Sequence, residues 1–186
     1  MERADKDLAF MLRYENVAWY DEGEVRVLDR RVYPAKIEFV VCKTVEDVAS
    51  AIRDMVTQST GPYTLAPMGM ALAAWKCRDM GREEKKRYLE DSSRIIYSSR
   101  PTTTKRMKML TDACIPVAMK AFEEGRRADE AVRDYVVEMN NARYNRVRNA
   151  AKYLVEKFPQ NGTVMTQCYA ETILGMMLLE CRERGN

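Results

Sequence analysis

The sequence predicts a mostly helical α+β protein. It begins with a small N-terminal antiparallel β element, continues as a helical bundle and ends in the first βα unit of an open α/β domain. Alternating apolar residues beside a tight turn are confined to the first part of the chain, before residue 43. From residue 45 onward, apolar residues recur at helical intervals. A β-rich run after a Pro-Gln-Asn-Gly turn then precedes one last helical pattern.

Residues 17–28 predict a β-hairpin, because apolar segments flank the turn Asp21-Glu22-Gly23. A third strand is expected over 37–42. A helix is expected over 45–57, since the residues from Thr44 have the spacing of a capping box and apolar residues follow at helical intervals.

The middle of the sequence predicts a helical bundle. Residues 59–64 have the composition of a loop. Four helices are expected to follow. The first includes Met68 to Trp75, the second covers 83–98, and the third starts at Pro101 with a kink at Pro116. The fourth and longest runs over 128–158 and is ended by Pro159.

The C-terminal residues predict a strand and a helix. Val164, Met165 and Thr166 are β-formers that lead to Cys168. Ligands of open α/β sheets bind at the carboxyl ends of strands, so Cys168 would lie at a site. The expected domains are therefore 1–158 and 159–186. The apolar face of the last helix would comprise Ile173, Leu174, Met177, Leu178 and Cys181.

Composition excludes several classes of protein. The chain is 46% apolar and 32% charged, which is typical of a globular protein. Its net charge of +3 is the difference between 31 basic and 28 acidic residues, too small a bias to indicate nucleic acid. The N-terminus has no signal-peptide pattern and no apolar run approaches a membrane span, so a cytoplasmic protein without membrane contact is expected.

The chain has no histidine and five widely spaced cysteines without a C-x-x-C pair. Neither a disulfide framework nor a zinc site is therefore expected, and no metal or cofactor is predicted. The usual general base near neutral pH is missing. Any proton transfer must use Cys, Asp, Glu, Lys, Tyr or a second chain.

Several segments resemble the methylthioribose-1-phosphate isomerases, a family shared with the ribose-1,5-bisphosphate isomerases and the α, β and δ subunits of translation initiation factor 2B. The resemblance covers residue 17 to the C-terminus. It is carried by Ala18 to Asp29, Cys42 to Val56, Met68 to Ala74 and Ser99-Arg100-Pro101-Thr102, while Thr166-Gln167-Cys168-Tyr169-Ala170 is similar to the family's T-H-C-N-A motif.

The resemblance implies an N-terminal β-plus-helix domain before a Rossmann-like catalytic domain, of which only the first βα unit is expected here. It implies cofactor-free aldose–ketose isomerisation of a sugar phosphate in methionine salvage. Cys168 matches the family's catalytic cysteine, and the aspartate partner of the later domain has no counterpart. The residues implied to contact the sugar phosphate are Gly61, Pro62, Tyr63, Thr64, Arg100 and Thr102.

The sequence departs from the family at both motifs. The family's R-G-A-P loop should fall at 58–62, where no arginine occurs, and the residues beside Cys168 are Gln167 and Tyr169. Glu171 replaces a glycine, and its carboxylate would oppose a bound anion or thiolate. Arg100 is either a phosphate ligand or a surface residue before a helix-starting proline.

Three hypotheses remain open. The favoured one is a divergent or divided isomerase subunit, inactive alone, whose missing half lies on a separate chain. The second is a non-catalytic regulatory or assembly module related to initiation factor 2B. The third, an RNA-associated factor, rests only on the translation-factor branch. An unpaired strand over 163–168 further predicts an oligomer with a second copy or a different chain, unless the segment folds back on the bundle.

Overall fold

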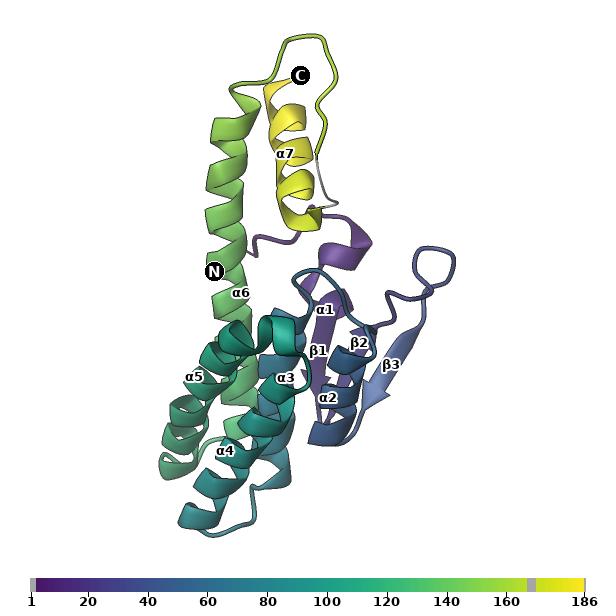
Figure 1. The fold of residues 1–186 in the computed structure, drawn as a ribbon. Coiled ribbons are helices and arrows are strands. Elements are labelled where there is room, and N and C mark those ends of the chain that lie inside the picture. Colours follow the sequence, from purple (N-terminus) through teal and green to yellow (C-terminus); the bar gives the residue numbers. More distant parts are fainter. Residues whose placement is uncertain (1–2, 167–169, 186) are drawn as a thin grey trace. The chain divides into compact units, whose positions relative to one another are not determined.

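The computed structural model describes residues 3–166 and 170–185 (Figure 1). The chain forms two compact units. One comprises residues 15–137, and the other combines residues 1–14 with 138–186. The expected domain boundary between residues 158 and 159 stays a prediction. No helix within the described residues is both long and apolar enough to cross a bilayer.

The unit of residues 15–137 contains a three-stranded antiparallel sheet in the order β1-β2-β3. The strands are β1 (Ala18–Asp21), β2 (Glu24–Leu28) and β3 (Phe39–Cys42). The predicted hairpin and third strand are therefore confirmed. Tyr20 pairs with Val25, and both side chains are fully buried on one face of the sheet.

Helices make up most of the chain, as predicted. The short elements are η1 (Phe10–Leu12), α1 (Tyr14–Val17) and η2 (Pro101–Thr103). The longer helices are α2 (Val45–Arg53), α3 (Pro62–Lys76), α4 (Arg82–Ser98), α5 (Thr104–Glu123), α6 (Ala128–Val155) and α7 (Glu171–Arg184). The capping box predicted for α2 is present, because Thr44 and Asp47 exchange hydrogen bonds with each other's backbone amides.

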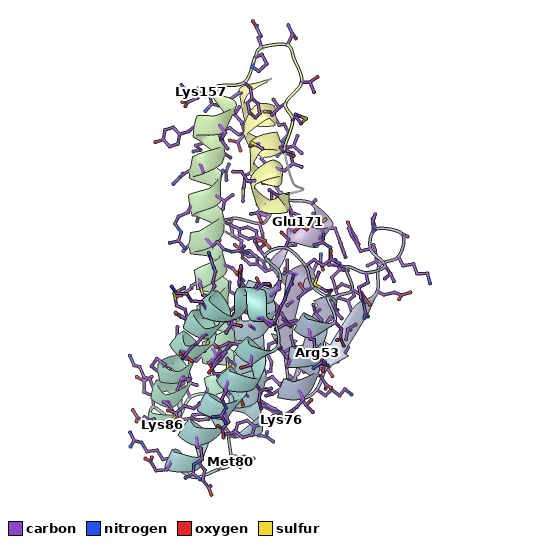
Figure 2. All side chains as sticks on the ribbon, in the orientation of Figure 1. Arg53, Lys76, Met80, Lys86, Lys157 and Glu171 are labelled. Atoms are coloured by element: carbon purple, nitrogen blue, oxygen red, sulfur yellow. The ribbon has the colours of Figure 1, made fainter. Side chains whose placement is uncertain are left out.

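Helix α3 lies at the centre of the 15–137 unit. Its residues from Thr64 to Ala74 are all buried, the pattern of a helix surrounded on every side. Gly69 permits the close packing, since a Cβ atom there would lie 2.8 Å from Val48 Cγ1 of α2 and 3.0 Å from Ile96 Cδ1 of α4. Charged side chains such as Arg53 and Lys86 lie on the outside of the same unit (Figure 2).

Several predicted boundaries were wrong. Helix α5 begins at Thr104 rather than at Pro101, because Pro101–Thr103 form the short η2. Residues 59–64 are not all loop, because α3 already begins at Pro62, whose fixed φ suits the first helical position. Helix α2 ends at Arg53 rather than 57, where Asp54 follows as the C-cap. Helix α6 ends at Val155, three residues before the expected end at Phe158.

In the other unit, α7 packs against the N-terminal segment. A Cβ atom at Gly175 would lie 3.1 Å from both Leu8 and Leu12. Within the described residues 163–166 no strand forms, because no neighbouring strand is there to pair with them. The expected apolar face of α7 is also displaced. Met176 and Met177 are buried, whereas Leu178 is 63% exposed.

Candidate functional site

The residues predicted to hold a phosphate begin at the start of α3. Gly61 is its N-cap, in a helical conformation, and Pro62 is its first residue. Gly61, Pro62 and Thr64 are buried and Tyr63 is half-buried. A Cβ atom at Gly61 would lie 1.9 Å from Thr57 Oγ1. The glycine is therefore required here by close packing against Thr57.

The backbone amides of this segment already have acceptors. The Gly61 N–H donates to the Gln58 carbonyl at 2.9 Å, and the Tyr63 and Thr64 N–H groups donate to the carbonyls of Thr60 and Gly61 at 3.1 and 2.9 Å. Pro62 has no N–H. In this conformation the expected row of amide donors for a phosphate is therefore occupied by local turns, and the assignment of 61–64 as substrate-binding stays a prediction.

Arg100 and Thr102 lie just before α5, because Arg100 is the N-cap of η2 and Thr102 lies within η2. Arg100 is half-buried and Thr102 is exposed. The Arg100 carbonyl accepts hydrogen bonds from the hydroxyls of Thr103 at 3.4 Å and Thr104 at 3.0 Å, so its backbone helps to fix the helix start. The Arg106 guanidinium lies 4.8 Å from the centre of the Tyr63 ring. The structure thus brings Tyr63 to the first turn of α5, with Arg106 rather than Arg100 as the observed contact.

Cys168, together with Gln167 and Tyr169, lies outside the described residues. Its assigned catalytic role stays a prediction. Glu171, the first residue of α7, is buried with a relative exposure of 6%.

Three other cysteines are unsuited to nucleophilic chemistry. Burial raises the pKa of Cys42 to about 12 and that of Cys77 to about 11. Burial also raises the pKa of Cys114, whose side chain is 1% exposed. Because the thiolate is the reactive form, these three thiols are inert near neutral pH. In the described part of the chain, no cluster of acidic or thiol side chains could hold a metal ion.

A second set of polar residues surrounds a pocket of about 460 Å³ at the opposite end of α5. We call it the basic pocket. Its walls come from the end of α3, the start of α4, the end of α5 and the start of α6, and its main residues are Trp75, Arg78, Lys85, Phe122, Arg126 and Arg127.

The turn between α5 and α6 shapes this pocket. The Gly125 N–H donates to the Phe122 carbonyl at 3.2 Å, and the Arg126 N–H donates to the Ala121 carbonyl at 2.9 Å. This is the hydrogen-bond pattern of a Schellman motif, which needs a left-handed residue at its centre. Gly125 supplies it with a φ of +66°. The turn therefore delivers two consecutive arginines, Arg126 and Arg127, to the same wall.

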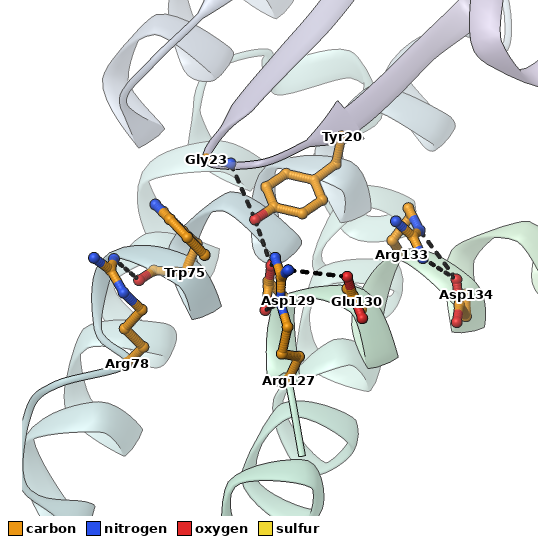
Figure 3. Close-up of polar contacts among 9 residues, drawn as sticks. All are labelled: Tyr20, Gly23, Trp75, Arg78, Arg127, Asp129, Glu130, Arg133 and Asp134. Atoms are coloured by element: carbon orange, nitrogen blue, oxygen red, sulfur yellow. Dashed lines mark hydrogen bonds and ion pairs between the residues drawn. The ribbon is translucent and has the colours of Figure 1, made fainter.

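Asp129 anchors Arg127 beside the pocket (Figure 3). The Arg127 guanidinium donates to Asp129 Oδ2 at 2.6 Å, and the Tyr20 hydroxyl donates to the same oxygen at 2.7 Å. Burial alone would raise the pKa of Asp129, but these two hydrogen bonds lower it below its usual value. The pKa of Tyr20 is raised, first by burial and then by its bond to Asp129. Asp129 is therefore a charged and immobilised carboxylate.

The sequence alone does not predict this pocket. Its signals were the spacing of Trp75 and Arg78, which puts a guanidinium one turn beyond an indole, and the Gly-Arg-Arg run at 125–127. Neither pattern identifies a site on its own, because the pocket forms only where four helix ends pack together. Local sequence does not predict that packing.

Curated proteins similar to this chain are methylthioribose-1-phosphate isomerases. That of Roseiflexus castenholzii is 29% identical over 170 residues, which covers 82% of this chain and 44% of the relative. That of Cereibacter sphaeroides is 27% identical over 158 residues, covering 82% of this chain and 42% of the relative. The chain is related to the methylthioribose-1-phosphate isomerases. It spans about two fifths of the length of these relatives, as expected for the N-terminal part of the isomerase family.

Two solved structures show the same fold. The δ subunit of translation initiation factor eIF-2B from A. fulgidus has a TM-score of 0.72 at 21% identity, over 92% of this chain and 52% of that one. The 5-methylthioribose 1-phosphate isomerase of Pyrococcus horikoshii has a TM-score of 0.68 at 20% identity, over 91% and 50%. No family model matches the chain. The predicted resemblance to the methylthioribose-1-phosphate isomerases is confirmed, and the resemblance to initiation factor 2B is confirmed for the fold.

Proposed function

We propose that this chain is the N-terminal domain of a divergent or divided sugar-phosphate isomerase of the methylthioribose-1-phosphate type, and that it does not catalyse isomerisation by itself. The names of its curated relatives support the substrate class. The observation that carries the proposal lies at the start of α3. The amides of Gly61, Tyr63 and Thr64 are bonded to local carbonyls, and residues 58–62 contain no guanidinium.

The proposed sugar-phosphate contacts are Arg100 and Thr102, with Cys168 as the group that would transfer protons. Arginine suits this role because its planar fork can bind a phosphate through two parallel hydrogen bonds. A single guanidinium without the expected amide donors should hold a sugar phosphate only weakly. The aspartate partner of Cys168 would come from a region beyond these 186 residues or from another chain.

An isomerisation assay tests the proposal. The purified chain should not convert methylthioribose-1-phosphate to its ketose above the buffer rate. Addition of a second polypeptide that carries the remaining part of the Pyrococcus horikoshii isomerase should restore turnover, and Cys168→Ser should abolish it. Turnover by the chain alone that is lost in Cys168→Ser would overturn the proposal.

The alternative function is a regulatory or assembly module related to the initiation factor 2B subunits. The altered 58–62 segment and the replacement of the residues beside Cys168 favour this alternative, because they remove groups that isomerase chemistry uses. In the same assay, a correctly assembled mixture that stays inactive would support the module over the divided enzyme. Size-exclusion chromatography of the mixture shows whether assembly took place.

A further inference from the structure

Four cations line the basic pocket, and three of them also form ion pairs with carboxylates outside its lining: Arg78 with Asp79 at 3.5 Å, Arg126 with Glu124 at 2.6 Å and Arg127 with Glu130 at 3.1 Å. Arg78, Lys85, Arg126 and Arg127 line it, whereas Asp129 is the acidic residue of the lining. Asp129 is 5% exposed and its charge already receives hydrogen bonds from Arg127 and Tyr20. Its carboxylate is therefore satisfied within the fold and presents little negative charge to the pocket.

Lys85 is the least balanced of the four cations. Its ammonium lies 4.5 Å from the centre of the Phe122 ring. Within residues 3–166 and 170–185, no carboxylate pairs with it. The aromatic ring attracts the ammonium but accepts no conventional hydrogen bond from it, whereas a phosphate oxygen would accept a charge-assisted one. Lys85 thus keeps its hydrogen-bond donors available.

The arginines are held in place, but their contacts do not use all of their N–H donors. Both Arg126 bonds go to one oxygen of Glu124, at 2.8 and 2.6 Å. The Arg78 Nη1 donates to the Trp75 carbonyl at 2.7 Å, and its guanidinium lies 4.1 Å from the centre of the Trp75 ring. Because a guanidinium has five N–H donors, each of these arginines retains donors for a ligand while its position is fixed.

The size of the pocket suits an anion larger than a monatomic ion. Its volume of about 460 Å³ is in the range of small-molecule sites. The start of α6 adds a partial positive charge, since the N-terminal end of a helix attracts anions. The pocket also differs in place from Arg100, because the 20 residues of α5 separate the two by roughly 30 Å.

From these observations we infer that the basic pocket binds a small molecule that carries a diphosphate group. Arg78, Lys85 and Arg126 would contact the phosphoryl oxygens, and Arg127, which Asp129 holds beside the pocket, would add positive charge. A diphosphate matches three ligating cations from three helix ends better than a single phosphate does, because it has enough charge and oxygens to contact all three.

Calorimetry with inorganic pyrophosphate tests the inference on the full chain. Pyrophosphate should bind more tightly than inorganic phosphate, and added salt should weaken it. Lys85→Met, which keeps the stem over Phe122, and Arg126→Gln should each weaken binding about tenfold, the effect of losing one charge-assisted hydrogen bond. Lys85→Glu should abolish it. Lys43→Met is the matched control. The Lys43 side chain is 73% exposed, and the residue directly follows β3.

Arg100→Ala separates this pocket from the proposed sugar-phosphate contact. It should leave pyrophosphate binding unchanged even if it removes sugar-phosphate binding. Circular dichroism and urea unfolding would show that each variant is folded. The inference is overturned if pyrophosphate does not bind the folded chain, or if Lys85→Met and Arg126→Gln bind it as well as Lys43→Met does.

Discussion

Tyr20 of β1 and Asp129 of α6 share a 2.7 Å hydrogen bond across 109 residues of sequence. The same hydroxyl accepts the Gly23 N–H at 3.2 Å, so it also closes the hairpin turn. One buried phenol therefore fixes the sheet to the start of α6 and, through Asp129, fixes the Arg127 guanidinium at the basic pocket.

Tyr20→Phe should destabilise the fold by about 1–3 kcal/mol, because it leaves the Gly23 N–H without its acceptor and removes one donor from the buried Asp129. Urea denaturation measures the change. Tyr153→Phe is the control, since Tyr153 is 70% exposed and should change the stability by less than about 0.5 kcal/mol. Equal effects of the two substitutions would contradict the role assigned to the Tyr20 hydroxyl.

Asp129 should contribute to the pH dependence of stability. Its pKa in the folded state is below the unfolded value, so its contribution is complete above the unfolded pKa of about 3.9 and is lost as the pH falls through the folded pKa. Asp129→Asn should therefore reduce the loss of unfolding free energy between about pH 5 and pH 2. Asp79→Asn, whose side chain is 87% exposed, should leave that loss unchanged. A slope unaltered by Asp129→Asn would refute the assignment.

Gly69→Ala should destabilise the 15–137 unit by about 1–3 kcal/mol, because the added methyl group would overpack the contact between α3 and Val48 of α2. Val48→Ala makes room for that methyl group. In the Val48→Ala background the cost of Gly69→Ala should therefore be smaller, and a double-mutant cycle from thermal or urea unfolding measures the difference. Identical costs in both backgrounds would show that the two side chains do not compete for this space.

The cysteines should differ in reactivity. Cys181 is half-buried, so iodoacetamide should label it in the native protein, whereas Cys42, Cys77 and Cys114 should react only after unfolding. Mass spectrometry of peptides from native and urea-treated samples measures each site, with Cys181→Ser to identify the native label. Native labelling of Cys114 as fast as that of Cys181 would contradict its burial.

Local patterns predicted the elements well. The hairpin, the capping box at Thr44 and the succession of helices each depend on neighbouring residues, and all are present. The start of α3 was missed because the Ser-Thr-Gly-Pro composition is typical of both a loop and a helix start. The displaced face of α7 has a different cause. Its buried residues are set by Leu8 and Leu12, which lie more than 150 residues earlier in the sequence.

The candidate sites likewise differ in whether local sequence predicts them. Arg100 and Cys168 could be proposed from short motifs, whereas the basic pocket could not, since Lys85 and Arg126 approach each other only through the packing of α4 and α5. A basic residue on a helix start is ordinarily a solvated side chain. Its significance here comes from the Phe122 ring that it contacts and from Arg126 and Arg127, which lie in the turn between α5 and α6.

Gly125 and Gly23 both have positive φ angles, yet the two positions differ in which substitutions they would tolerate. Nothing lies within 4 Å of a Cβ atom at Gly125, so only the handedness of the backbone disfavours other residues there. Asparagine, which tolerates this conformation, could drift into position 125 and preserve the turn that presents Arg126. At Gly23 a Cβ atom would lie 2.5 Å from Trp75 Nε1, so that position is closed to every side chain. The turn beside the basic pocket can thus accept asparagine in place of Gly125 and keep its shape, whereas the turn at Gly23 cannot.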